Sequence, residues 1–269
     1  MDVPRYGQHP LLEITDVLHP GVVYLAKYIQ GSRSDVPDLE ALGSKMLVVK
    51  IIYSGLAAEG YGEPVHRYLA RHDMAPQYFF SFNVKLVGLP DLEVPMECHH
   101  VMEYLASPSD ESSGWISLLD LEEQFPTVAS GSKQDIKNAL IHIIHVLQKE
   151  QYVHGDFRPN NLLICVQITT GPDGKSCIIQ SHPDNPRFPY LKIIDFDWAG
   201  LAEEALYPLN RNPDVAWPGE DGMTISLTDD KKMIGSWLEH WPGQTSVPVS
   251  IPDQEERGDN IVTLQIRRV

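Results

Sequence analysis

The sequence predicts an α+β fold in two unequal parts, and three observations lead to this prediction. The first 105 residues hold several runs of strand length and one helical pattern, which is typical of a mainly antiparallel sheet. From residue 106 onward the chain begins with a polar linker and continues with a long amphipathic helix. The length of 269 residues, at about 150 residues per domain, suits one large domain or two small ones.

Five strands and one helix are expected in the first part. The strands are apolar or β-branched runs, and they cover 11–18, 22–29, 46–53, 78–89 and 98–105. The tripeptide His19-Pro20-Gly21 joins the first two runs as a hairpin turn, whereas 31–45 is polar and loop-like. The helix is expected over 61–72, where apolar residues recur at helical spacing and Pro64 suits the first turn.

The second part is expected to start with a helix and continue with a small hairpin. Residues 106–114 are small and polar, and 132–151 carry the clearest helical pattern of the chain. The apolar stripe of that helix consists of Ile136, Leu140, Ile143, Ile144 and Leu147. Two short strands are expected over 161–168 and 190–194. The Gly-, Pro- and Asp-rich stretch 170–188 between them predicts a loop.

Charge and cysteine content argue against several classes of protein. Acidic residues number 37 and basic residues 21, so the formal net charge is −16 at pH 7. Such a surface repels phosphate backbones and anionic lipids, so neither nucleic acid nor a membrane is an expected partner. The three cysteines form no CxxC pair and indicate neither a disulfide framework nor a zinc knuckle. With no signal-peptide pattern and no apolar run of about 18 residues, an intracellular protein is expected, cytoplasmic or nuclear.

Two polar motifs carry the chemistry. HGDFRPNN (154–161) follows the long helix, and the apolar run LKII leads into the second motif, Asp195-Phe196-Asp197. Phosphoryl transfer needs one carboxylate at the attacking hydroxyl, together with a second carboxylate and an amide oxygen that hold Mg²⁺. The two motifs supply these groups in the order of the kinase template H-R-D-x-x-x-x-N followed by D-F-G. The two motifs thus match the groups that phosphoryl transfer needs.

The chain resembles the protein-kinase-like superfamily, which includes the eukaryotic protein kinases and the aminoglycoside and choline phosphotransferases. HGDFRPNN and DFDWAG are most similar to the fungal-type protein kinases, and YGEPVHRYLARHDMAP and YPLN add to the resemblance, which runs from about residue 12 to 236. The resemblance implies a two-lobed kinase-like fold with ATP and Mg²⁺ as cofactors. Its small antiparallel-sheet N-lobe would span 1–105 and its shortened, mainly helical C-lobe 106–240, before an irregular tail over 241–269.

The resemblance also implies roles in the transfer step. Asp156 would be the catalytic base or would orient the attacking hydroxyl, and Arg158 would steady the γ-phosphate. Asn161 and Asp195 would bind Mg²⁺. Asp230, in LTDDKKMI, would be the buried helix aspartate that braces the loop around Asp156.

Nucleotide-binding residues are implied in the same way. Lys50, inside MLVVKII, would contact the α- and β-phosphates. The hinge would place backbone groups against the adenine ring, and its residues are Met102, Glu103, Tyr104 and Leu105. Glu63 is the best candidate for the carboxylate that pairs with Lys50, although Pro64 puts it at the start of its helix, and Glu59 is the alternative.

The chain departs from the kinase pattern at several points. Only Gly21 stands where the glycine-rich loop belongs, so nucleotide affinity would rest on Lys50, Mg²⁺ and the hinge. Gly155 replaces the arginine of H-R-D, which argues against a switch by activation-loop phosphorylation. Asp197 replaces the glycine of D-F-G, which favours a more fixed magnesium loop. No clear A-P-E follows, and the stretch after Asp195 is too short for the later helices of a full C-lobe.

Simpler interpretations of the same residues stay open. The acidic and amide residues of the two motifs would also suit ordinary turns, where Asp and Asn are favoured. Lys50 would also suit an edge strand, on which a lysine discourages aggregation. The pairs His142/His145 and His99/His100 lack a complementary set of metal ligands, so satisfied surface histidines are expected there.

An ATP- and Mg²⁺-dependent phosphotransferase is therefore expected, with a protein serine or threonine hydroxyl as the acceptor. A small-molecule kinase of the aminoglycoside or choline type is the alternative enzyme, because these kinases also carry glycine at the position of Gly155. A pseudokinase that acts as a binding module is the alternative of another class, favoured by the missing glycine-rich loop and the short second lobe. The residues leave the acceptor and the oligomeric state open.

Overall fold

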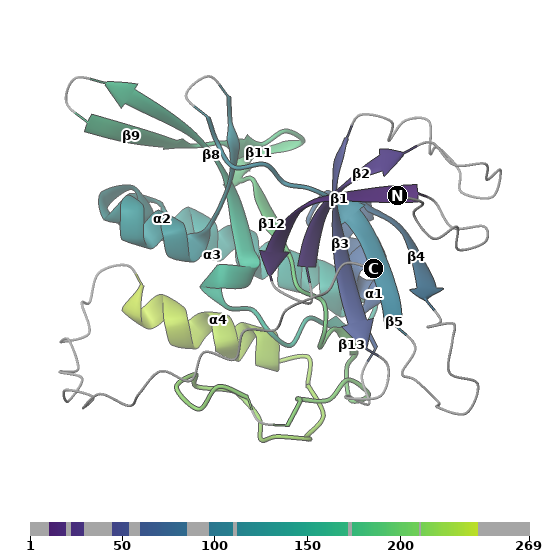
Figure 1. The fold of residues 1–269 in the computed structure, drawn as a ribbon. Coiled ribbons are helices and arrows are strands. Elements are labelled where there is room, and N and C mark those ends of the chain that lie inside the picture. The colour runs from purple at the N-terminus through teal and green to yellow at the C-terminus, as the bar shows by residue number, and fades with distance from the viewer. Residues whose placement is uncertain are drawn as a thin grey trace, which may run out of the picture.

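The computed structural model describes residues 11–19, 23–29, 45–53, 60–84, 97–109, 112–171, 174–209 and 211–241. These residues form an α+β fold, as the sequence predicts. Figure 1 shows a five-stranded antiparallel sheet on one side of the molecule and helices α2, α3 and α4 on the other. Gly21, Glu59 and all but the first residue of the expected C-terminal tail lie outside the described residues.

The five-stranded sheet is built from the first part of the chain. Its strands are β1 (Leu11–His19), β2 (Val23–Ile29), β3 (Met46–Tyr53), β4 (Tyr78–Val84) and β5 (Glu97–Glu103). Their order is β1-β2-β3-β5-β4, and every neighbouring pair is antiparallel. Side chains of the sheet itself form a small core, and its buried residues are Ala26, Leu47, Val49, Phe80 and Val101. The five expected strands are thereby confirmed.

Both edge strands of this sheet are irregular. In β1 the pairing register with β2 shifts between Ile14 and Asp16 and again between Val17 and His19. In β4 the register with β5 shifts between Tyr78 and Phe80. Such a shift bends a strand and increases its twist. The pairings of the central strand β3 with β2 and with β5 have a continuous register, and they hold Lys50 opposite Val23 of β2 and His100 of β5.

The larger hydrophobic core joins the helix of the first part to those of the second. Val65 and Leu69 of α1 (Glu63–Arg71) belong to the same buried cluster as the apolar stripe of α3 (Pro126–Lys149). Burying each large aliphatic side chain contributes about 1.5–3 kcal/mol. The stripe expected for the long helix is buried, as predicted, although α3 begins at Pro126 rather than 132. α2 (Leu118–Gln124), which precedes α3, and α4 (Asp229–His240) complete this layer.

The second part contains more sheet than the sequence predicted. The stretch 170–188, expected as a loop, lies mostly within strands instead, and the expected two-stranded hairpin is part of a larger set. The strands of this set are β6 (Gly114–Ser117), β8 (Leu162–Gly171), β9 (Gly174–Ile179), β10 (Ser181–His182), β11 (Asn185–Pro189) and β12 (Leu191–Ile193). β8 pairs with β6, β9 and β12. The loop expectation was wrong because several glycines and prolines of this stretch lie at the ends of short strands, while residues such as Ile178 and Ile179 favour extended backbone.

Two short elements position the polar motifs. β7 (Tyr152–Val153), directly after α3, pairs with β13 (Gly200–Leu201), which follows the second motif. The single 3₁₀ turn Pro159–Asn161 ends the first motif and leads into β8. The two motifs, distant in sequence, are therefore connected through neighbouring pairs of strands.

Gly62 brings the start of α1 against the second motif. Its amide donates a hydrogen bond to the carbonyl oxygen of Phe196 over 2.8 Å. A Cβ atom at this position would lie 2.4 Å from the carbonyl oxygen of Ala199 and 2.8 Å from that of Phe196. Because both obstacles are backbone atoms, only glycine fits without displacing the chain.

We therefore expect Gly62→Ala to lower the free energy of unfolding by about 1–3 kcal/mol through overpacking, measured by urea denaturation. Gly235→Ala is the matched control, because Gly235 lies in α4 with no atom within 4 Å of an added Cβ. That helix substitution should stabilise the protein by about 0.5–1 kcal/mol. Equal stability of Gly62→Ala and the wild type would contradict the close approach of α1 to the second motif.

Candidate active site

A cavity of about 330 Å³ lies between the five-stranded sheet and the segments that carry the two polar motifs. Apolar side chains from β2, β3, β8 and the end of β12 line it, among them Val23, Val48, Leu163 and Ile194. Seven of the residues singled out from the sequence also line it: Lys50, Met102, Glu103, Tyr104, Leu105, Asn161 and Asp195. The cavity is thus mainly apolar, and the ammonium group of Lys50 lies in its wall beside polar groups.

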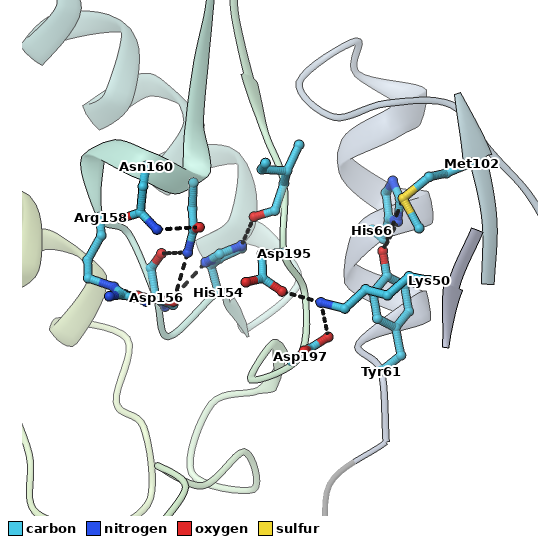
Figure 2. Close-up of polar contacts among 12 residues, drawn as sticks. Lys50, Tyr61, His66, Met102, His154, Asp156, Arg158, Asn160, Asp195 and Asp197 are labelled. Atoms are coloured by element: carbon cyan, nitrogen blue, oxygen red, sulfur yellow. Dashed lines mark hydrogen bonds and ion pairs between the residues drawn. The ribbon is translucent and has the colours of Figure 1, made fainter. Parts of the chain in front are cut away.

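Lys50 forms ion pairs with two carboxylates of the second motif (Figure 2). Its Nζ lies against Asp195 Oδ1 and is 2.6 Å from Asp197 Oδ1. Burial alone would lower the pKa of Lys50, but the two carboxylates outweigh burial and raise it. Burial would raise the pKa of Asp195, yet Lys50 holds it below its usual value, whereas burial keeps the pKa of Asp197 raised.

Glu63 has other partners. Its carboxylate accepts hydrogen bonds from Arg67 Nε at 2.8 Å, from the Tyr78 hydroxyl at 2.8 Å and from Ser81 Oγ at 3.1 Å. The expectation that Glu63 pairs with Lys50 is therefore not met among the ion pairs of the described residues. The reason is its place at the first residue of α1, from which the side chain reaches β4. Its pKa is lowered, because the hydrogen bonds outweigh burial.

The first motif gathers its polar side chains around Asp156. Asn161 Nδ2 donates to the carbonyl oxygen of Asp156 over 3.1 Å and to its Oδ2 over 2.7 Å. Arg158 donates from Nη2 to Oδ2 over 2.7 Å and from Nε to Oδ1, which is a bidentate ion pair. The bond to Asp156 raises the pKa of Arg158. The guanidinium, which the resemblance directs to a phosphate, thus lies on the carboxylate of Asp156.

Asp230 braces the same motif from α4, as expected from the sequence. Its Oδ2 accepts the amide of His154 and its Oδ1 the amide of Gly155, both over 2.8 Å. Gly155 has φ +83°, and a Cβ there would lie 2.7 Å from Ile225 Cδ1. A left-handed backbone with no room for a side chain explains glycine at this position. Burial raises the pKa of Asp230.

Phe196 packs between two histidines. Its ring stacks on His66 of α1, with centroids 4.3 Å apart and planes 6° apart, and it meets His154 edge-on at 5.1 Å. Nε2 of His66 faces the carbonyl oxygen of Pro76 at 2.8 Å, so it donates there, and Nδ1 accepts from the Tyr61 hydroxyl at 2.6 Å. Neither Tyr61 nor His66 is among the site residues predicted from the sequence. The only signal was that His66 lies on the apolar side of its helical pattern, beside Val65.

The described residues hold no group of three or more His, Cys, Asp or Glu side chains that could form a metal site. This finding does not test a magnesium site, because Mg²⁺ is typically bound by one or two carboxylates, substrate phosphates and water. Within the same residues, no helix combines the length and apolar character needed to cross a membrane. Cys98, Cys165 and Cys177 are free thiols.

No protein-family model matches the chain, and a search of curated proteins found no match. The described residues contain two polar clusters: Lys50 with Asp195 and Asp197 (Figure 2), and Asp156 with Arg158 and Asn161. The first cluster combines an ammonium group with two carboxylates, and its Lys50 and Asp195 line the apolar cavity together with Asn161 of the second. The second cluster orients a buried carboxylate through two donors.

Two buried histidines predict acid sensitivity. Burial lowers the pKa of both His66 and His100 to about 4, below the ordinary value of 6.5. The unfolded chain therefore binds protons first as pH falls from 6.5 towards 4, so stability is complete above that range and is lost within it. We expect about 2 kcal/mol per histidine to be lost at pH 5, measured by urea unfolding at pH 7 and 5. His66→Gln should flatten this dependence, whereas exposed His72→Gln should leave it steep.

The brace from α4 gives a second prediction. In Asp230→Asn one of the two backbone amides loses its acceptor and meets an NH₂ group instead, so we expect a loss of about 2–3 kcal/mol in the free energy of unfolding. Asp214→Asn, at an exposed position, should change it by less than about 0.5 kcal/mol. Similar stabilities of the two variants would show that the amides of His154 and Gly155 do not depend on Asp230.

Proposed function

We propose that the protein is an ATP- and Mg²⁺-dependent phosphotransferase with a two-lobed protein-kinase-like fold, and that its acceptor is a serine or threonine hydroxyl of a protein. One observation carries the proposal: Lys50, Asn161 and Asp195 line a single cavity, and Asn161 is hydrogen-bonded to Asp156. Three separate segments of the chain thus bring together the groups that phosphoryl transfer requires.

The cavity suits a nucleotide in shape and in polarity. Its apolar walls would hold an adenine ring, and the backbone from Met102 to Leu105 at its edge would supply hydrogen-bonding groups. Lys50, in its wall, would contact the α- and β-phosphates. The net charge of −16 does not oppose this assignment, because the cation and the motif carboxylates act locally.

The donor set beside Lys50 also fits magnesium. Asp195 offers a carboxylate and Asn161 an amide oxygen, which are hard oxygen ligands. The bound ion would neutralise charge on the phosphates. Asp195 has φ +69°, an uncommon conformation for a residue other than glycine, and such backbone strain is concentrated at functional sites.

Asp156 would receive or orient the proton of the attacking hydroxyl. Its carboxylate is buried, and the bidentate ion pair with Arg158 fixes its direction. In this proposal Arg158 acts by orienting Asp156. The arrangement differs from the resemblance, which directs Arg158 to the γ-phosphate.

The topology also supports a kinase-like fold. A five-stranded antiparallel sheet with one helix comes first, the segment after β5 lines the cavity, and a helical layer with the two polar motifs follows. Asp230 of α4 accepts two hydrogen bonds from backbone amides of the first motif, and Phe196 of the second motif packs on α1. These contacts connect the helices to the two motifs. Each of these features serves to hold the motifs in place across the cavity.

A second candidate function is nucleotide binding without transfer. It is favoured by the two oxygens of Asp156, which already accept hydrogen bonds from Arg158 and Asn161. Such a protein would act as a nucleotide-responsive binding module. Its nucleotide affinity would match that of the enzyme, so only the transfer of phosphate separates the two functions.

Transfer of labelled phosphate from Mg-ATP tests the proposal, with mixed proteins and a panel of hydroxylated metabolites as acceptors. We expect labelled protein, and Asp156→Asn should reduce the rate at least about 100-fold, as loss of a general base does. Asp214→Asn is the control with the same chemical change at an exposed site. Labelling of metabolites alone would identify a small-molecule kinase.

Nucleotide binding is measured separately by thermal denaturation. Mg-ATP at 100 times its Kd should stabilise the folded protein by about 2.7 kcal/mol, and Lys50→Met should reduce this effect. Stabilisation without transfer would support the binding module. A wild-type protein that neither binds Mg-ATP nor transfers phosphate would overturn both candidates.

A further inference from the structure

We propose that Asp197 is the residue that positions Lys50 for the nucleotide phosphates, the task for which the sequence suggested Glu63. The inference rests on the proposed function, because Lys50 matters to it as a phosphate-binding group. Beyond that function, Asp197 stands where the kinase template has glycine, and the proposal assigns it a task at this position. Three side chains and their partners decide between the two carboxylates: Lys50, Glu63 and Asp197.

Lys50 is enclosed on several sides. Its side chain is 10% exposed, its Nζ is 2.6 Å from Asp197 Oδ1, and the ring of Tyr61 lies 5.9 Å from the same nitrogen. Tyr61 is itself fixed by its hydrogen bond to His66. A flexible four-carbon side chain is therefore held with its ammonium group in the wall of the cavity, and the carboxylates that hold it come from one short turn (Figure 2).

Glu63 is already satisfied by three donors. The Arg67 guanidinium, the Tyr78 hydroxyl and the Ser81 hydroxyl all donate to its carboxylate. Arg67 also lies over the Tyr78 ring, with its Cζ 4.2 Å from the ring centroid. Moving Glu63 to Lys50 would break this whole group of contacts. Glu63 thus stabilises the junction of α1 and β4, and it leaves Lys50 to the second motif.

Asp197 is the carboxylate that remains dedicated to Lys50. Asp195 is the residue that the proposed function assigns to the metal, so its oxygens would serve two cations. The turn that carries Asp197 is fixed from outside by two contacts of Phe196, the hydrogen bond from the Gly62 amide and the stacking on His66. A fixed turn can present a side chain with constant direction, which a glycine at this position could not supply.

The role of Asp197 is one of positioning, because its partner is Lys50 and not the substrate. Loss of its charge should leave Lys50 with Asp195 alone, so that Lys50 and the metal would compete for one carboxylate. The expected result is weaker nucleotide binding and a raised KM for ATP, with a smaller change in kcat. Asp197→Glu keeps the charge and should restore part of the affinity.

The test measures the Kd of Mg-ATP and of Mg-ADP by isothermal titration calorimetry for the full chain and its Asp197→Asn, Asp197→Glu and Glu63→Gln variants. We expect Asp197→Asn to raise the Kd about tenfold. In Asp197→Glu at least about a third of that change in log Kd should be recovered. Glu63→Gln should raise the Kd by less than about threefold. Asp214→Asn controls for the loss of one negative charge at an exposed site. Circular dichroism checks that each variant is folded.

The opposite ranking, with Glu63→Gln more damaging than Asp197→Asn, would overturn the inference and return the role to Glu63. Tighter binding by Asp197→Asn would also overturn it, because Asp197 would then hold Lys50 away from the nucleotide. If Asp197→Asn does not fold, Asp197→Glu and the double variant Lys50→Met/Asp197→Glu take its place. The effect of Asp197→Glu should then disappear in the Lys50→Met background, and its persistence would count against the role. Failure of the wild type to bind either nucleotide would instead refute the proposed function.

Discussion

Phe196 has no exposed surface, and the positions of both polar clusters depend on how it packs. Its ring lies flat on His66 of α1 and edge-on to His154 of the first motif. Its carbonyl oxygen accepts the amide of Gly62, at the start of α1. The residues on either side of it, Asp195 and Asp197, both hold Lys50 of the sheet. One buried aromatic side chain thus determines where the sheet, α1 and the two motifs meet.

The charges around this aromatic side chain are arranged in compact, mutually neutralising groups. Lys50 and Asp156 are both almost fully buried, and each has a partner of opposite charge within direct contact. Removing one member of a buried pair leaves the other without compensation, which costs far more than the intact pair contributes. These pairs are therefore a sign of a defined local geometry more than of added stability. A polar ligand that enters the cavity must replace such contacts with others of similar strength.

The sequence allowed the α+β class and the five strands to be predicted, because these depend on local patterns, whereas the resemblance named about half of the residues that line the cavity. A β-branched run around Lys50 and the five-residue spacing of Asp156 and Asn161 are visible in a single segment. The expected brace by Asp230 is confirmed, although its contacts with His154 and Gly155 join segments far apart in sequence. In this case the family resemblance supplied what local periodicity could not.

The failures concern choices between partners and between competing local signals. Glu63 had several possible donors, and its three contacts became clear only once α1 and β4 were placed side by side. Arg158 lies two residues from Asp156 and forms an ion pair with it, which the sequence did not predict, and its expected contact with the γ-phosphate stays a prediction. In 170–188 the glycines and prolines suggested a loop, whereas pairing with β8 made 174–179 a strand. Pairing of strands is a tertiary effect and has no counterpart in the local sequence.

The irregular registers of β1 and β4 affect how the molecule behaves among copies of itself. A sheet edge offers unpaired amide and carbonyl groups that can template the addition of another chain, most readily when the edge is flat, long and apolar. β1 is nine residues long and exposes Ile14, Val17 and Leu18 by about half, so a regular β1 would meet this description. Its two register shifts interrupt the flat ladder where these side chains lie, and β4 has a shift at the opposite edge. Bulges of this kind, which leave the central strands undisturbed, are a feature by which sheets avoid pairing edge to edge.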